Sequence, residues 1–286
     1  MIARRSFIFA ALCTVAVPAL AADATATADS VLTAADGRSV PIRITWPRDG
    51  KGRLPLLVLS HGANGTLDGL VLFQRSLTRG RIVVAAQHPD SEANPDLAKV
   101  DRMTVFPQRV ADMRLVLDSV ATVERLSGKR IDRRRIAAAG HSYGALVAQA
   151  LGGARVSGQD WRDARVTRVV AFSPPGTLPT MITTEGWAKM RVPQFVQTGT
   201  ADVVPPIAPT WEAHMASFEA AGVPGSALWV GRGVDHYFGN RIQRLSRVAA
   251  DQGAAFRLAT ELADRFLNAK KLVAEPGVLT ERMVRK

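Results

Sequence analysis

One five-residue stretch constrains this chain more than any other: Gly140-His141-Ser142-Tyr143-Gly144. The apolar run at 135–139 before it is typical of a buried strand, and the run at 145–151 after it is typical of a helix. A G-x-S-x-G pattern in that setting forms a sharp turn that holds the serine hydroxyl clear of the sheet. A glycine-rich turn without any chemical role is the alternative. The strand and helix around the pattern favour a nucleophilic Ser142.

Short apolar runs alternate with helical stretches along the rest of the chain. The runs typical of buried strands are 54–60, 81–87, 166–172, 192–198 and 226–230. The stretches with helical spacing are 69–77, 107–126, 209–221 and 256–267. Two earlier segments, 31–34 and 40–46, predict an edge hairpin that turns at Asp36-Gly37. The pattern predicts an α/β fold with a mostly parallel central sheet of about eight strands and helices on both faces.

The two longest irregular segments limit what can cover the site. Only residues 173–191 separate the strand at 166–172 from the next one, so we expect no large lid domain. Residues 88–106 are polar and rich in proline. A long segment of this kind either borders a substrate cleft or lies on the surface as a loop, and both interpretations stay open.

The first residues have the pattern of a cleavable export signal. Arg4-Arg5 precedes an apolar stretch at 7–17, and Ala19-Leu20-Ala21 follows it as a small-residue cleavage site. We therefore expect a signal peptide at 1–21 and a single catalytic domain at 22–286, in the periplasm or outside the cell. The paired arginines fit a twin-arginine signal and a general secretion signal equally well.

Cysteine content and charge exclude several kinds of site. The only cysteine, Cys13, lies in the leader, so the remaining chain needs no disulfide and has no thiolate chemistry. The net charge of the 286 residues is +12, but the basic residues are scattered apart from the stretch 130–135. No nucleic-acid motif accompanies them. We expect a solvated basic surface and a loosely held basic tail at about 270–286.

A second glycine-rich stretch, His61-Gly62-Ala63-Asn64-Gly65, follows the apolar run at 54–60. In a nucleophile-elbow fold, the loop after the third strand supplies one backbone N–H to the oxyanion hole, and the residue after the serine supplies another. We assign these donors to Ala63 and Tyr143. An ordinary strand-to-helix turn is the alternative for this loop.

A serine nucleophile needs a histidine base, and the chain has five histidines. His61 belongs to the oxyanion loop, His141 is held within the elbow, His88 precedes Ser142, and His214 falls inside a predicted helix. His236 alone lies in a loop after the last predicted strand. The order serine, acid, histidine that this architecture uses therefore selects His236 as the base.

The acid that orients the base should lie between Ser142 and His236 in the sequence. Asp202, in Gly199-Thr200-Ala201-Asp202, follows a predicted strand and precedes a predicted helix. A turn or helix-capping aspartate is the alternative for it. Asp235 is the rival, but adjacent side chains in a loop usually diverge, so Asp235 is better suited to ordering the histidine loop.

The chain resembles the α/β-hydrolase superfamily and, within it, the bacterial dienelactone-hydrolase-like esterases related to platelet-activating-factor acetylhydrolases and polyester-degrading hydrolases. The stretches that carry the resemblance are Leu59-Ser60-His61-Gly62, His88-Pro89, Arg109 with Asp112, the 140–144 elbow, 199–202 and Asp235-His236-Tyr237. Ala145 stands where this group has a further glycine, and Ser142 replaces the cysteine of true dienelactone hydrolases. The resemblance implies ester hydrolysis without a cofactor.

Together these features predict an exported serine hydrolase that cleaves carboxylic esters through an acyl-enzyme on Ser142. An amide or peptide hydrolase with the same three residues is one alternative, and a noncatalytic envelope binding protein on a hydrolase fold is another. The expected partner is a small-molecule or lipid-like ester. We expect no nucleic acid, cofactor or stable membrane span, and a monomer by default. We also expect no metal, because no His/Asp/Glu cluster has ligand spacing in the sequence.

Overall fold

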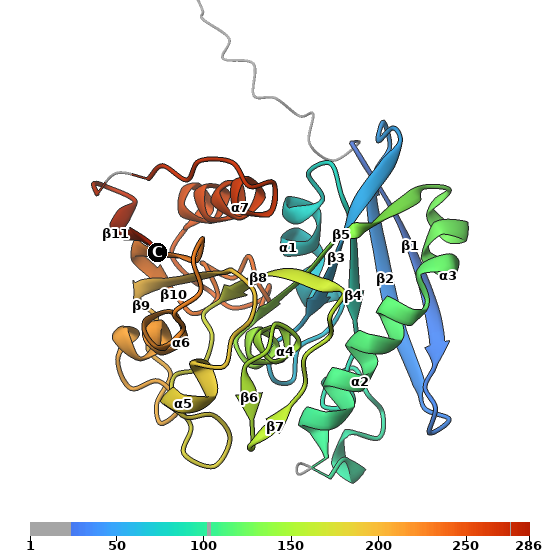
Figure 1. Ribbon diagram of the computed structural model, residues 1–286, viewed down its shortest axis with the longest axis horizontal. Helices are drawn as coiled ribbons and strands as arrows, with labels where there is room; N and C mark the ends of the chain where they lie inside the picture. Colours follow the sequence, from blue (N-terminus) through green and yellow to red (C-terminus); the bar gives the residue numbers. More distant parts are fainter. Residues whose placement is uncertain (1–23, 102–103, 275) are drawn as a thin grey trace, which may run out of the picture.

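A nine-stranded sheet runs through the computed structural model, which describes residues 24–286 apart from 102, 103 and 275 (Figure 1). The strand order is β1-β2-β4-β3-β5-β8-β9-β10-β11. The six central strands are parallel: β3 (Arg53–Ser60), β4 (Ile82–Ala86), β5 (Arg130–His141), β8 (Val166–Phe172), β9 (Gln194–Ala201) and β10 (Ala227–Asp235). Their carboxyl ends therefore meet at one edge, where sites form in such sheets. The predicted leader at 1–21, with Cys13, lies outside the described residues.

Antiparallel strands close both ends of the sheet. β1 (Thr25–Thr33) pairs with β2 (Ser39–Pro47), as the hairpin pattern predicts, and β2 pairs with β4. At the other end, β11 (Thr280–Arg285) pairs with β10. The prediction of a loosely held tail at 270–286 is thus wrong for β11. Without β11, the edge of β10 would leave backbone N–H and C=O groups unpaired.

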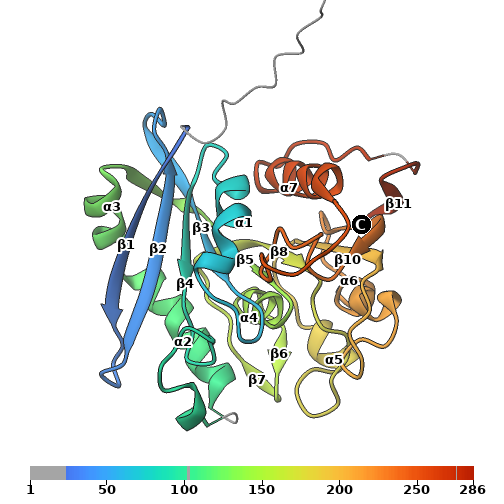
Figure 2. The same cartoon turned by 180° about the vertical axis from the view of Figure 1, so that it is seen from behind.

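Helices cover both faces of the sheet (Figures 1 and 2). One face holds α1 (Val71–Leu77) and α7 (Gly253–Leu267), whose Phe73 and Phe256 rings pack with Phe172 in one buried cluster. The opposite face holds α2 (Val105–Asp118), α3 (Val120–Ser127), α4 (Tyr143–Leu151) and α6 (Ala216–Ala220). The predicted arrangement of helices on both faces is therefore confirmed.

Two predicted helices differ in detail. The helix predicted at 107–126 breaks at Ser119, because α2 packs over β3 and β4 whereas α3 packs over β1 and β2. The helix predicted at 209–221 is the 3₁₀ turn η3 (Trp211–Met215) followed by α6. The remaining short elements are η1 (Asp68–Leu70), η2 (Leu97–Lys99), α5 (Thr184–Trp187), and the small hairpin β6 (Arg155–Val156) and β7 (Gln159–Asp160).

No large lid covers the carboxyl edge in the described part of the chain, because only the four-residue α5 forms between β8 and β9. The 88–106 segment lines a hollow of about 680 Å³ with residues of β2 and α2. Its lining includes His88 but not Ser142, Asp202 or His236. Within residues 24–286, as far as they are described, no helix has the length and apolar character that a membrane crossing needs.

Candidate active site

Ser142 occupies the tight turn between β5 and α4. Its backbone angles are φ 54° and ψ −121°, in the left-handed half of conformational space that L-residues rarely adopt. A Cβ on Gly144 would lie 2.2 Å from the carbonyl oxygen of Ser60, and one on Gly140 would lie 2.1 Å from the oxygen of Gly144. The predicted strand–turn–helix is therefore present, and both glycines are required by close backbone contact.

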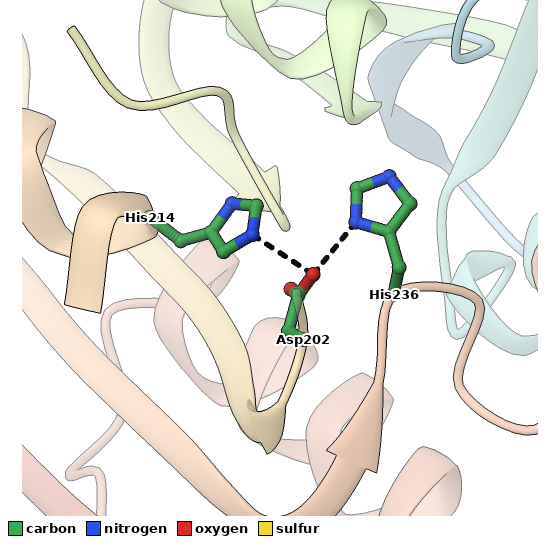
Figure 3. A group of neighbouring side chains, drawn as sticks. All are labelled: Asp202, His214 and His236. Atoms are coloured by element: carbon green, nitrogen blue, oxygen red, sulfur yellow. Dashed lines mark hydrogen bonds and ion pairs between the residues drawn. The ribbon is translucent and has the colours of Figure 1, made fainter. Parts of the chain in front are cut away.

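Asp202 and His236 follow the ends of the neighbouring parallel strands β9 and β10. The Nδ1–H of His236 donates to Oδ1 of Asp202 at 2.7 Å (Figure 3). The other carboxylate oxygen, Oδ2, accepts a hydrogen bond from the Thr198 hydroxyl at 2.8 Å. Asp202 is fully buried and His236 is 8% exposed. The structure thus pairs the two residues that the sequence selects as acid and base.

Burial alone would raise the pKa of Asp202, but contacts from His214 and His236 outweigh that effect and hold its pKa well below the ordinary range. Asp202 is therefore ionised at neutral pH. An ionised carboxylate at Nδ1 fixes the imidazole of His236 in one tautomer, with Nε2 free to accept a proton.

Asp235, the rival acid, has another role. Its Oδ1 accepts hydrogen bonds from the backbone N–H groups of Tyr237 and Gly239, both at 3.0 Å. Its Oδ2 pairs with Arg247 at 2.8 Å. Asp235 therefore orders the loop that carries His236, as the divergence of adjacent loop side chains predicts.

His141 connects the serine turn to the histidine loop. Its Nε2 donates to the backbone carbonyl of His236 at 2.7 Å, and the two rings lie 4.7 Å apart between centroids. His236 is thereby held beside the residue that precedes Ser142. Among the described residues, the Ser142 hydroxyl makes no hydrogen bond to His236, which is common before substrate binds.

The loop predicted to supply the second oxyanion donor packs directly against the serine turn. A Cβ on Gly62 would lie 3.3 Å from Cβ of Ser142, so Gly62 brings the loop into contact with the serine turn. Ala63, the next residue, is exposed. Tyr143 is the first residue of α4, a position whose backbone N–H has no partner within the helix. Tyr143 thus adjoins Ser142 in the chain, and Ala63 follows the glycine that contacts the serine turn.

A buried arginine holds the oxyanion loop in place. Arg109 on α2 is fully buried and forms a two-pronged ion pair with Asp90, with both N–O distances 2.8 Å. The same guanidinium donates to the backbone carbonyls of His61 at 2.6 Å and Gly62 at 3.0 Å. It also lies 4.7 Å from the centroid of the Tyr143 ring. The sequence resemblance includes Arg109, but nothing in the sequence indicates Asp90.

A second serine–histidine–aspartate chain lies beneath this loop. Ser60 Oγ lies 2.8 Å from Nε2 of His88, and Nδ1 of His88 lies 3.0 Å from Oδ2 of Asp112. All three side chains are buried, with at most 1% exposed. Burial and the charge of Arg109 lower the pKa of His88 well below its ordinary value. This chain of hydrogen bonds is structural, since no substrate can reach Ser60.

Gln243 is a site residue that sequence reasoning misses. Its side-chain Oε1 lies 3.0 Å from Nδ1 of His141, and its backbone N–H donates to the carbonyl of Gly69 at 2.8 Å. A Cβ on Gly65 would lie only 1.7 Å from its Nε2. Gln243 therefore joins the histidine loop, the serine turn and the oxyanion loop. It follows no motif, so no sequence signal identifies it.

His214 also reaches the acid, because Nε2 of His214 lies 2.9 Å from the same Oδ1 of Asp202 (Figure 3). Spacing along the sequence indicates no histidine–carboxylate cluster, but the fold forms one. Donor atoms of Asp202, His214 and His236 lie within 4.8 Å of one another. Three separate elements supply them, which a search for sequence spacing cannot detect. The 2.7 and 2.9 Å contacts are nevertheless shorter than the roughly 3.3 Å between two ligands of a tetrahedral ion, so they fit shared protons better than a metal.

Comparison with known proteins identifies the fold. No protein-family model matches the chain, and no curated protein matches its sequence. A putative dienelactone hydrolase from Klebsiella pneumoniae superposes with a TM-score of 0.64 at 14% identity, over 86% of this chain and 99% of that one. A Pyrobaculum calidifontis esterase gives 0.58 at 19% identity, over 85% of each chain. A Rhizomucor miehei esterase gives 0.60 at 17% identity, over 86% and 83%. The chain therefore has the α/β-hydrolase fold.

Proposed function

We propose that this protein is a serine-dependent carboxylic ester hydrolase. The observation that carries the proposal is the 2.7 Å hydrogen bond between His236 and Asp202, formed beside a serine turn with a positive φ angle. The solved structures named above share only the fold with this chain, and they are described as esterases and a putative dienelactone hydrolase, which supports ester chemistry.

In the proposed reaction, Ser142 Oγ attacks the acyl carbonyl while Nε2 of His236 takes its proton. Asp202 stabilises the imidazolium that forms. His236 then gives the proton to the leaving alkoxide, and the ester C–O bond breaks to leave an acyl-enzyme. Water, activated by His236, hydrolyses the acyl-enzyme and restores Ser142.

The negative charge that develops on the carbonyl oxygen needs fixed donors. The backbone N–H groups of Ala63 and Tyr143 would serve, and Arg109 holds the loop that carries Ala63. Two aimed donors of this kind lower a barrier by several kcal/mol in total. Since no large lid forms between β8 and β9, we propose short or medium acyl esters as substrates.

We also propose that the protein acts outside the cytoplasm, in the periplasm or beyond. The support is the leader pattern at 1–21 together with the lack of cysteine after it. Amino-terminal sequencing of protein recovered from the extracytoplasmic fraction tests this, and an intact leader on active cytoplasmic protein would contradict it.

The decisive experiment treats residues 22–286 with a serine-directed fluorophosphonate, with Ser142→Ala as the matched variant. Turnover of p-nitrophenyl acetate, butyrate and octanoate is measured in parallel with an acyl p-nitroanilide. We expect wild type to label and to cleave the esters faster than the anilide, and Ser142→Ala to do neither. Anilide cleavage at the ester rate would favour an amide hydrolase. Folded wild type that neither labels nor turns over would favour a noncatalytic binding protein.

A further inference from the structure

One oxygen of Asp202 faces two imidazoles. His236 approaches Oδ1 at 2.7 Å and His214 approaches the same atom at 2.9 Å, and the ring centroids of the histidines are 5.7 Å apart (Figure 3). The proposed reaction uses only His236. His214 comes from η3, on the far side of Asp202, and is 1% exposed. Its proximity to the acid therefore needs its own explanation.

Both ring nitrogens of His214 face oxygen atoms that can only accept. Nδ1 lies 2.6 Å from the backbone carbonyl of Pro174, and Nε2 lies 2.9 Å from the ionised carboxylate. A neutral imidazole carries an N–H on only one ring nitrogen, so its other nitrogen would point a lone pair at an oxygen. The imidazolium form presents an N–H at both contacts. The Nε2 contact is an ion pair rather than an aligned hydrogen bond, so its strength comes mainly from charge.

We propose that His214 is a positively charged positioning residue of the site, which partly neutralises the carboxylate of Asp202 that His236 faces. The inference rests on the proposed function of Asp202 and His236. It agrees with the raised pKa of His214: burial acts to lower that pKa, but the close contact with the Asp202 carboxylate and its charge outweigh the effect. His214 does not touch the reacting atoms and is not a catalytic residue.

The other charged and titratable groups around this pair do not replace His214. From the β5 turn, His141 faces His236, and burial lowers its pKa to about 3, so it is neutral. Asp235 on β10 is paired with Arg247. Glu212, on η3 itself, is exposed. From β11, Arg282 contacts Met215 rather than the histidines.

A fixed cation near His236 has a definite consequence for pH dependence. It offsets part of the attraction that the Asp202 carboxylate exerts on positive charge at His236. Removing the cation leaves the full charge of Asp202 facing His236. At 5.7 Å, one unit charge shifts the acid limb of kcat/KM by roughly 0.5 to 2 pH units, depending on the local dielectric.

Direct observation of His214 tests the charge without any enzymatic assay. Protein labelled with ¹⁵N-histidine is titrated by NMR from pH 5 to 8, and the His214 signals are assigned with His214→Gln. We expect both ring nitrogens of His214 to carry protons at pH 7. A neutral His214 at pH 6 would overturn the proposal, whether or not the protein proves to be an esterase.

Two variants then test the consequence. His214→Gln keeps an N–H donor near Asp202 without charge, and His214→Phe removes both. We expect each to move the acid limb of kcat/KM to higher pH by about 0.5 to 2 units. His214→Gln should keep the plateau within about threefold, whereas His214→Phe should lower it further. Glu212→Gln, on the same turn, is the control and should leave the limb in place. An unmoved limb in a folded His214→Gln protein would refute the proposal.

Discussion

His141 donates a hydrogen bond from Nε2 to the backbone carbonyl of His236, so the residue before the proposed nucleophile holds the main chain of the proposed general base. The separation of Ser142 from His236 therefore depends on this contact as well as on the strands. His141 has a second partner in Gln243, 3.0 Å away. The elbow histidine, which occupies the variable position of the motif, has a positioning role in this protein.

Replacing His141 with Phe should impair catalysis through geometry. The ring volume is retained, but the His236 carbonyl and the Gln243 amide lose a buried partner, which costs about 1–3 kcal/mol of stability. We expect kcat to fall about 10- to 100-fold with little change in KM. The single variant Gln243→Leu and the double variant complete a thermodynamic cycle. Strictly additive effects would show that the two side chains act independently.

Replacing Asp202 with Asn should abolish most of the activity. The neutral amide no longer stabilises the imidazolium of His236, and it favours the wrong tautomer, so kcat should fall by about 10³- to 10⁴-fold. Asp235→Asn is the matched control, since Asp235 only orders the loop, and it should lose less than about tenfold. Steady-state kinetics with p-nitrophenyl butyrate measure both. If Asp235→Asn proved the more damaging, the acid would have been misassigned.

Arg109 should be more important for stability than any surface charge. Arg109→Met leaves Asp90 buried without a partner, which should lower the free energy of unfolding by about 3–5 kcal/mol. It also frees the loop at Gly62, so phosphonate labelling of Ser142 should slow. Urea unfolding and labelling rates measure the two effects. Adding Asp90→Leu should restore part of the stability but not the labelling rate, and equal recovery of both would argue against a role in positioning the loop.

Acid should destabilise the fold through its buried neutral histidines. Burial, the largest cause, lowers the pKa of His141 to about 3, and burial with the charge of Arg109 lowers the pKa values of His61 and His88 well below 6.5. Below about pH 6.5 the unfolded chain therefore binds more protons, and each histidine costs about 1.4 kcal/mol per pH unit. Asp112 opposes this, because burial raises its pKa to about 6 and the native state keeps that proton.

The expected net effect is a loss of about 2–3 kcal/mol in unfolding free energy between pH 6 and pH 5. Urea unfolding at pH 7, 6 and 5 measures it. His141→Gln removes one titrating group, so its stability should fall less steeply by about 1.4 kcal/mol per pH unit. A wild-type stability that stays flat down to pH 5 would mean that these imidazoles are protonated in the folded protein.

Gly144→Ala should severely destabilise the protein. The new Cβ would meet the Ser60 carbonyl at 2.2 Å, a backbone atom that cannot move without displacing β3. Gly222→Ala is the matched control, because nothing lies within 4 Å of its Cβ. We expect the first variant to lose several kcal/mol or to fail to fold, and the second to stay within about 0.5 kcal/mol of wild type. A Gly144→Ala protein with an unchanged melting temperature would contradict the packing described at the turn.

Much of the architecture follows from local sequence. The elbow is predictable from the spacing of its motif. The parallel strands, and the loops after them that carry Asp202 and His236, are predictable from the apolar runs. The edge strand β11 is not, since three of its six residues are charged and exposed, and its contacts are with residues distant in the sequence: pairing with β10, and packing of Met283 and Val284 on two core clusters.

The supporting residues of the site escape sequence reasoning for a related reason. Asp90, His214 and Gln243 are brought to the site by chain segments far from Ser142, and none belongs to a local pattern. From the sequence alone, His214 is equally consistent with a buried helical residue that has no role in the site. Only the three-dimensional meeting of η3, β9 and β10 reveals its contact with Asp202.

The buried chain of Ser60, His88 and Asp112 shows that matching geometry does not by itself make a catalyst. Its hydrogen bonds, 2.8 and 3.0 Å long, resemble those expected of a working triad. A search for such a hydrogen-bonded chain alone would therefore select these buried residues. Access to bulk solvent separates the two serines: Ser142 stands at an open edge of the sheet, and Ser60 is sealed beneath it. Loss of Ser142 should accordingly leave no reserve nucleophile, however closely Ser60 reproduces its surroundings.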